Sequence, residues 1–172
     1  MDESEIRVLE QGVLLHDVGN IGIPDALLEK KDALDENERL LMQKHPEIGY
    51  SLLSRIKFLK EPAQVVLQHH ERYDGQGYPQ GLKGEKIHLG ARIFAVADMF
   101  EALTYSRSSR TAENIENACM EIQMMSGTLL DPLIVDQFLK IPLQDLKEIS
   151  GNITKNAGLS RMRRAVPKTN RD

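Results

Sequence analysis

The chain has 172 residues, of which 41% are hydrophobic and 28% are charged, a balance typical of a globular protein with one domain. The net charge of only −4 excludes a highly charged disordered chain, and the single cysteine, Cys119, excludes a disulfide-stabilised scaffold. Because no apolar run approaches the length that spans a bilayer, about 20 residues, and the N-terminus lacks a signal-peptide pattern, we expect a cytoplasmic protein without a membrane span.

Positive charge is concentrated at the C-terminal end. Residues 151–172 contain six basic residues and one acidic residue, so the first 150 residues carry a net charge of −9. We interpret residues 1–150 as the folded domain and residues 151–172 as a basic, flexible tail. A solvated tail is favoured over a nucleic-acid patch, and no nucleic-acid polymer is expected as a partner.

Apolar residues recur at helical spacing along nearly the whole chain, and alternating strand patterns are scarce, which predicts an all-α fold. The first helix is predicted over residues 5–18, with Gly19 as its C-terminal stop. Its apolar face is formed by Ile6, Leu9, Val13 and Leu14.

Further helices are predicted between clear start and stop signals. Asp35 and Glu38 form a capping-box pattern that opens a helix interrupted at His45-Pro46 and continuing to residue 56. Pro62 begins a helix that ends at His69-His70, and a glycine-rich loop follows over 74–84. The apolar segment 89–104 predicts a central buried helix. Three more helices are predicted: one capped by Thr111 and ending at Gly127, one from Asp131-Pro132 to about residue 139, and one over 143–149.

Histidines and aspartates lie where the helical pattern predicts the core. His16 and Asp17 follow Val13 by three and four residues, and His45 lies on the apolar face of its helix. Asp98 is the only acid within residues 93–100, and an unpaired buried carboxylate is costly.

Each of these residues alone has an ordinary explanation. A single core histidine usually bonds to the backbone, and a buried aspartate usually pairs with an arginine, here Arg92 or Arg107. Taken together, imidazoles and carboxylates from several helices favour a multinuclear site for iron, manganese, zinc or a similar ion.

A long series of motifs resembles the HD-GYP branch of the HD-domain phosphohydrolases, in the order and spacing of that family. The matching segments are His16-Asp17-Val-Gly-Asn20, His45-Pro46, His69-His70-Glu71, Asp74-Gly-Gln-Gly77-Tyr78-Pro79, Ala91-Arg92-Ile93 with Asp98, and Gly127 with Asp131-Pro132. The series covers about residues 5–140.

The resemblance implies an HD-domain helical bundle with a glycine-rich surface loop, and hydrolysis of cyclic di-GMP to pGpG or GMP. It implies two or three divalent metal ions, iron or manganese. The metal-ligand positions correspond to His16, Asp17, His45, His69, His70 and Asp98, with Asp17 as a bridging, catalytic carboxylate. Gly77, Tyr78 and Pro79 correspond to the loop that names the branch, and Arg107 and Arg110 to two basic residues that contact substrate.

Two of these assignments have alternatives. Positive φ angles in turns explain the loop glycines Gly75, Gly77, Gly81 and Gly84 but do not explain Tyr78-Pro79, so substrate contact is favoured, with Tyr78 stacking on a guanine. For Arg107 and Arg110, substrate contact and a solvated pair near a helix end are equal alternatives.

The chain also departs from the family. Asn20 stands at the catalytic lysine position, and only 15 residues precede His16, so an upstream histidine ligand has no counterpart. We therefore expect a phosphodiesterase of reduced activity. The alternative is a catalytically silent receptor or interaction module in bacterial second-messenger signalling; a nucleotide monophosphate substrate is disfavoured by the loop. An upstream sensor or receiver domain, or a homodimer, is the protein partner to expect.

Overall fold

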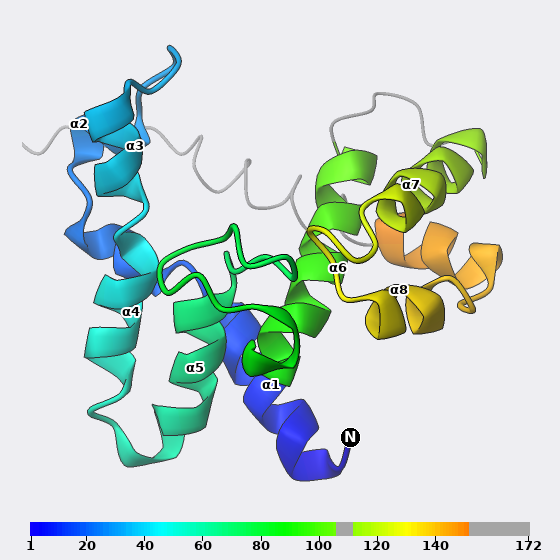
Figure 1. The fold of residues 1–172 in the computed structure, drawn as a ribbon, viewed down its shortest axis with the longest axis horizontal. Coiled ribbons are helices and arrows are strands. Elements are labelled where there is room, and N and C mark those ends of the chain that lie inside the picture. The colour runs from blue at the N-terminus through cyan, green and yellow to red at the C-terminus, as the bar shows by residue number, and fades with distance from the viewer. Residues whose placement is uncertain (106–111, 152–172) are drawn as a thin grey trace, which may run out of the picture.

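The computed structural model describes residues 1–105 and 112–151, and these ranges contain helices and loops but no strand (Figure 1). The all-α prediction is confirmed. The elements are α1 (Glu3–Leu15), η1 (Val18–Gly22), α2 (Asp25–Leu28), α3 (Glu36–Met42), α4 (His45–Leu53), η2 (Lys57–Leu59), α5 (Lys60–Gln68), η3 (Gly84–Lys86), α6 (Leu89–Tyr105), α7 (Ala112–Met124) and α8 (Pro132–Phe138). Residues 143–151 are also helical. Within the described ranges, no helix is long and apolar enough to cross a bilayer.

Some predictions fall on residues that the structure does not describe. The substrate-contact assignments of Arg107 and Arg110, the Thr111 cap and the tail beyond residue 151 all lie outside the described residues.

Helix α1 is shorter than predicted and is rotated about its axis. It begins at a capping box of Asp2 and Glu5 and ends at Leu15, where the chain turns toward the 3₁₀ helix η1. The predicted apolar face is wrong at Leu14, which is 82% exposed, and at Ile6, which is 44% exposed. A Cβ added at Gly12 would lie 2.6 Å from Cβ of Val65 in α5. The side of α1 that carries Gly12 therefore packs against α5, because the missing side chain lets the two helices approach closely.

The break between α3 and α4 falls just before His45. The predicted capping box of Asp35 and Glu38 opens α3, and Pro46 lies in the first turn of α4. The start of α4 packs directly on η1, since a Cβ added at Gly19 would lie 1.8 Å from the carbonyl oxygen of His45. Only glycine permits this approach.

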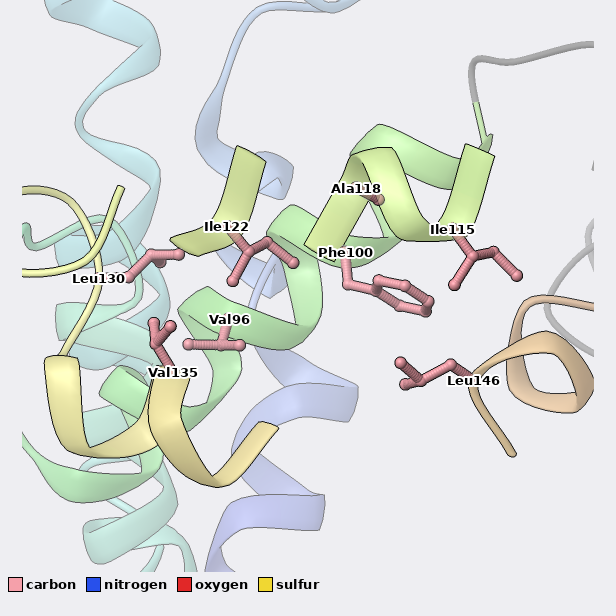
Figure 2. Packing of buried hydrophobic residues seen from close by; sticks show 8 residues of the cluster. All are labelled: Val96, Phe100, Ile115, Ala118, Ile122, Leu130, Val135 and Leu146. Atoms are coloured by element: carbon pink, nitrogen blue, oxygen red, sulfur yellow. The ribbon is translucent and has the colours of Figure 1, made fainter. Parts of the chain in front are cut away.

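The second half of the chain packs around α6. Eight buried residues form its apolar core (Figure 2): Val96, Phe100, Ile115, Ala118, Ile122, Leu130, Val135 and Leu146. Arg92 pairs with buried Asp131, the N-cap of α8, at 2.5 Å. The alternative in which Arg92 neutralises Asp98 is therefore wrong, because Arg92 is committed to the α6–α8 contact.

Candidate metal centre

Four histidines from three helix ends lie close together. His16 follows α1, His45 begins α4, and His69 and His70 follow α5. One ring nitrogen from each of His45, His69 and His70 lies within 4.8 Å of the others. The rings of His16 and His69 meet edge to face, with centroids 5.4 Å apart. Residues separated by more than fifty positions in the sequence are thus brought into one cluster.

The backbone fixes which nitrogen each imidazole presents. Nδ1–H of His16 donates to the carbonyl of Val13 at 2.7 Å, and His69 makes the same bond to Val66. Nδ1–H of His45 donates to the carbonyl of Met42 at 2.8 Å. Because each bond spans three residues at a helix turn, the three Nε2 atoms point away from their own backbone and into the cluster.

The Nε2 atoms of His45 and His69 lie only 3.2 Å apart. With Nδ1 protonated on both rings, both Nε2 atoms present lone pairs, which repel at this distance unless a cation lies beside them. Two nitrogens that bind one ion at about 2.1 Å are separated by roughly 3 Å. The arrangement therefore fits a bound metal ion.

Asp17 supplies the carboxylate of the cluster. Its Oδ2 lies 3.4 Å from Nε2 of His16, and its Oδ1 lies 3.5 Å from Nε2 of His45. Hydrogen bonding to His16 lowers the pKa of Asp17 to about 2 and raises the pKa of His16. The expectation that Asp17 lies on a buried helix face is wrong, because its side chain is 55% exposed. A carboxylate with one oxygen toward each of two histidines could act as a metal ligand beside both imidazoles.

His69 and His70 are held neutral by their surroundings. Burial lowers the pKa of His69 to about 3 and that of His70 to about 4, with the neighbouring histidines adding to the effect. A neutral imidazole is the form that binds a metal, so at neutral pH these two rings could accept an ion without first losing a proton.

Asp98 differs from its predicted environment. It lies on an exposed side of α6 rather than in the core. Burial of part of the carboxyl group raises its pKa, and the opposing influence comes from His16. Asp98 is thus electrostatically coupled to His16 of the cluster.

The glycine-rich loop folds back over His70. The ring of Tyr78 stacks on that of His70, with centroids 4.7 Å apart and planes inclined by 24°. Burial raises the pKa of Tyr78 to about 12, so its hydroxyl is neutral at physiological pH. The His70 ring therefore covers one face of the Tyr78 ring.

The loop glycines act in two different ways. Gly75, Gly81 and Gly84 have positive φ angles, as turn geometry predicts. The same explanation is wrong for Gly77, whose φ angle is not positive. A Cβ added at Gly77 would lie 2.3 Å from the amide nitrogen of Arg72, so close backbone approach requires this glycine.

Asn20 occupies η1 next to the cluster. Its Oδ1 atom is buried and has no hydrogen-bond partner among the described residues. An unpaired buried oxygen is costly, and such atoms are concentrated at functional sites. No cationic side chain comes from position 20, where the resemblance places a lysine.

Two contributors were not predicted for their observed roles. Phe94 packs against His16, with ring centroids 4.9 Å apart, and its position one helical turn before Asp98 is the signal for it. Glu71 directly follows the histidine pair, and its carboxylate accepts hydrogen bonds from the loop amides of Gln80 and Leu82.

Comparison with known proteins places the chain among HD-domain proteins. A scan of family models matches residues 1–134 to the family described as HD domain. The response regulator RpfG of Xanthomonas campestris pv. campestris, named a cyclic di-GMP phosphodiesterase, is 44% identical over 156 residues, which cover 90% of this chain and 41% of the relative. A cyclic di-GMP phosphodiesterase of Thermotoga maritima is 41% identical over 143 residues, covering 82% of this chain and 39% of the relative.

A solved structure agrees with these relatives. The crystal structure of a cyclic GMP-AMP-specific phosphodiesterase of V. cholerae, V-cGAP3, superposes with a TM-score of 0.63 and 25% sequence identity. The match covers 90% of this chain and 44% of that one. The present chain therefore spans less than half the length of the relatives it matches.

Proposed function

The chain belongs to the HD-domain family, in its HD-GYP branch, and from this membership we propose that it is a metal-dependent phosphodiesterase that hydrolyses cyclic di-GMP to pGpG or GMP. The observation that carries the proposal is the 3.2 Å approach of the His45 and His69 Nε2 atoms, beside the carboxylate of Asp17. Such an approach of lone pairs fits a metal centre better than a structural histidine pair.

The ligand set that we propose for two divalent ions, iron or manganese, is His16, Asp17, His45, His69, His70 and Asp98. When bound, divalent ions supply acidified water and neutralise charge on the phosphodiester oxygens. The protein supplies the ligand atoms. Neutral His69 and His70 offer lone pairs, and Asp17 stays ionised at neutral pH because its pKa is about 2. In the metal-free protein, the hydrogen bond between His16 and Asp17 holds a proton at Nε2 of His16.

The substrate side of the site is the loop around Tyr78. The face of the Tyr78 ring opposite His70 is suited to stacking on a guanine, while Pro79 restricts the backbone beside it. The loop amides and glycines bring this ring next to the metal-binding histidines, so that a stacked base would place its phosphate near the cluster.

The experiment that tests the function begins with anaerobic purification of the chain, followed by metal analysis. The loaded protein is then incubated separately with cyclic di-GMP and with 3′3′-cyclic GMP-AMP, and the products are separated chromatographically. We expect metal-dependent formation of pGpG or GMP from cyclic di-GMP, abolished in His45→Ala. Preferential hydrolysis of cyclic GMP-AMP would reassign the substrate. Binding of metal and nucleotide without any product would favour the silent receptor.

Reduced activity is a separate part of the proposal, and it rests on Asn20. The absence of a cation at this position removes charge stabilisation near the developing oxyanion, an effect typically worth about 10²- to 10³-fold in kcat. We expect Asn20→Lys to raise kcat of the metal-loaded protein by up to this factor. The control is Asn20→Gln, which lengthens the side chain without adding a charge. Equal kcat values for the two variants would show that the charge at position 20 has no catalytic role.

A further inference from the structure

Glu71 places a carboxylate inside the protein directly after the two histidines of the cluster. Its residue is only 5% exposed. A buried carboxylate must be compensated by hydrogen bonds or opposite charge. Here Oε1 accepts from the amide of Gln80 at 2.7 Å and Oε2 accepts from the amide of Leu82 at 3.0 Å. Both oxygens of Glu71 are thus directed at the loop.

The same loop is held against the histidine pair at a second place. The amide of Tyr78 donates to the carbonyl of His70 at 3.2 Å, and the two rings stack. Gly77 lies against the backbone of residues 70–72, where a side chain would clash. Tyr78 is therefore held at two places. Its own backbone amide bonds to His70, and the carboxylate of Glu71 binds the amides of Gln80 and Leu82, which we call the clamp.

From this geometry we infer that Glu71 is a positioning residue. It fixes residues 80–82 so that the ring of Tyr78 is held on His70 before any substrate arrives. The loop is thereby coupled to the metal-binding histidines. The Tyr78 ring is already ordered when a nucleobase binds, so binding does not lose the free energy of ordering it. The role in nucleobase binding rests on the proposed function, whereas the clamp itself does not.

Hydrogen exchange measures the clamp without any nucleotide. In Glu71→Gln the side chain keeps its size, but its amide group has only one acceptor oxygen, so it can satisfy only one of the two loop amides. We expect one of the Gln80 and Leu82 amides to exchange at least about tenfold faster while the other keeps its protection, a ratio matching the loss of a hydrogen bond to a charged acceptor. The control is Glu85→Gln, an exposed residue of η3 directly after the loop, which should change neither amide. Unchanged exchange at both amides in Glu71→Gln would overturn the inference.

A double-mutant cycle tests whether Glu71 acts through Tyr78. With metal content confirmed equal, we expect Glu71→Gln to raise the Kd for cyclic di-GMP about five- to tenfold in the wild-type background, the effect of one lost hydrogen bond. In the Tyr78→Ala background the same substitution should change Kd less than about twofold. Equal effects in both backgrounds would overturn the positioning role, because they would show that Glu71 does not act through this ring. If the wild-type chain binds no cyclic di-GMP, the proposed function fails, and the exchange result still decides the clamp.

Discussion

The two halves of the molecule use their interiors differently (Figure 1). In the half built from α1 to α5, the described residues Leu53, Leu59, Ala63 and Val66 form an apolar cluster. The buried polar residues His45, His69 and Glu71 belong to the same part of the chain. In the half built on α6 to α8, eight apolar residues form the cluster (Figure 2). All five histidines of the chain precede residue 89.

The difference separates function from stability. Burial of apolar side chains stabilises the α6–α8 half at any pH and in any metal concentration. The first half gives interior volume to imidazoles, and the Nε2 lone pairs of His45 and His69 repel each other unless a cation lies beside them. We therefore expect its stability, but not that of the second half, to depend on metal ions and on protons.

The largest effect expected in the histidine half is the loss of metal from Asp17→Ala. This carboxylate faces both His16 and His45, so its removal should lower metal affinity by more than about 100-fold, beyond what loss of an outer partner costs. Glu71→Gln should retain its metal, because Glu71 bonds to the loop. Elemental analysis after dialysis measures both variants. Equal metal content would remove Asp17 from the ligand set.

The corresponding change in the other half is Ile122→Ala. Ile122 is fully buried, and truncation should lower the free energy of unfolding by about 2 to 5 kcal/mol. Metal content should not change. The control is Met124→Ala, an exposed position of the same helix, with an expected change within about 0.5 kcal/mol. Urea unfolding measures the stability of both, and loss of metal from Ile122→Ala would show that the two halves are not independent.

Acid should destabilise the metal-free protein through the histidine half. The pKa values of His69 and His70, about 3 and about 4, lie below the ordinary value of 6.5. Between about pH 6.5 and pH 4 the unfolded chain therefore binds more protons than the folded one, and the free energy of unfolding falls by up to about 1.4 kcal/mol per pH unit for each histidine. His16 opposes this trend, because its pKa is raised.

Urea unfolding with a chelator at a series of pH values measures this dependence. His70→Gln, which removes one titrating ring, should flatten the curve in this window. A curve that is equally steep in that variant would assign the pH dependence to other groups.

The smallest effect expected concerns the loop. Tyr78→Ala should weaken binding of cyclic di-GMP by about 1 to 3 kcal/mol, the usual contribution of base stacking, and leave metal content unchanged. Tyr78→Phe keeps the ring and should bind nearly as well as the wild type. Calorimetry that finds all three proteins equal in affinity would limit the loop to a structural role.

Local patterns in the sequence were enough to predict the helices and most members of the cluster. The capping box at Asp35 and the N-cap at Asp131 are interactions between residues two or three positions apart, so the sequence contains all their partners. The histidines could be recognised because polar residues at core positions of an amphipathic pattern are unusual. The order and spacing of the motifs that contain them then indicated the family.

The sequence by itself therefore determined the helical architecture and the residue types of the proposed ligand set, since both depend on near neighbours and residue type. Only the tertiary structure decided the exposed faces of Asp17 and Asp98, the pairing of Arg92 with Asp131, and the direction of Glu71 toward the loop. These depend on how helices rotate about their axes when they pack, and that rotation is set by close contacts such as Gly12 against Val65. Contacts between residues far apart in the chain leave no periodic signal in the sequence, so they could not be predicted from it.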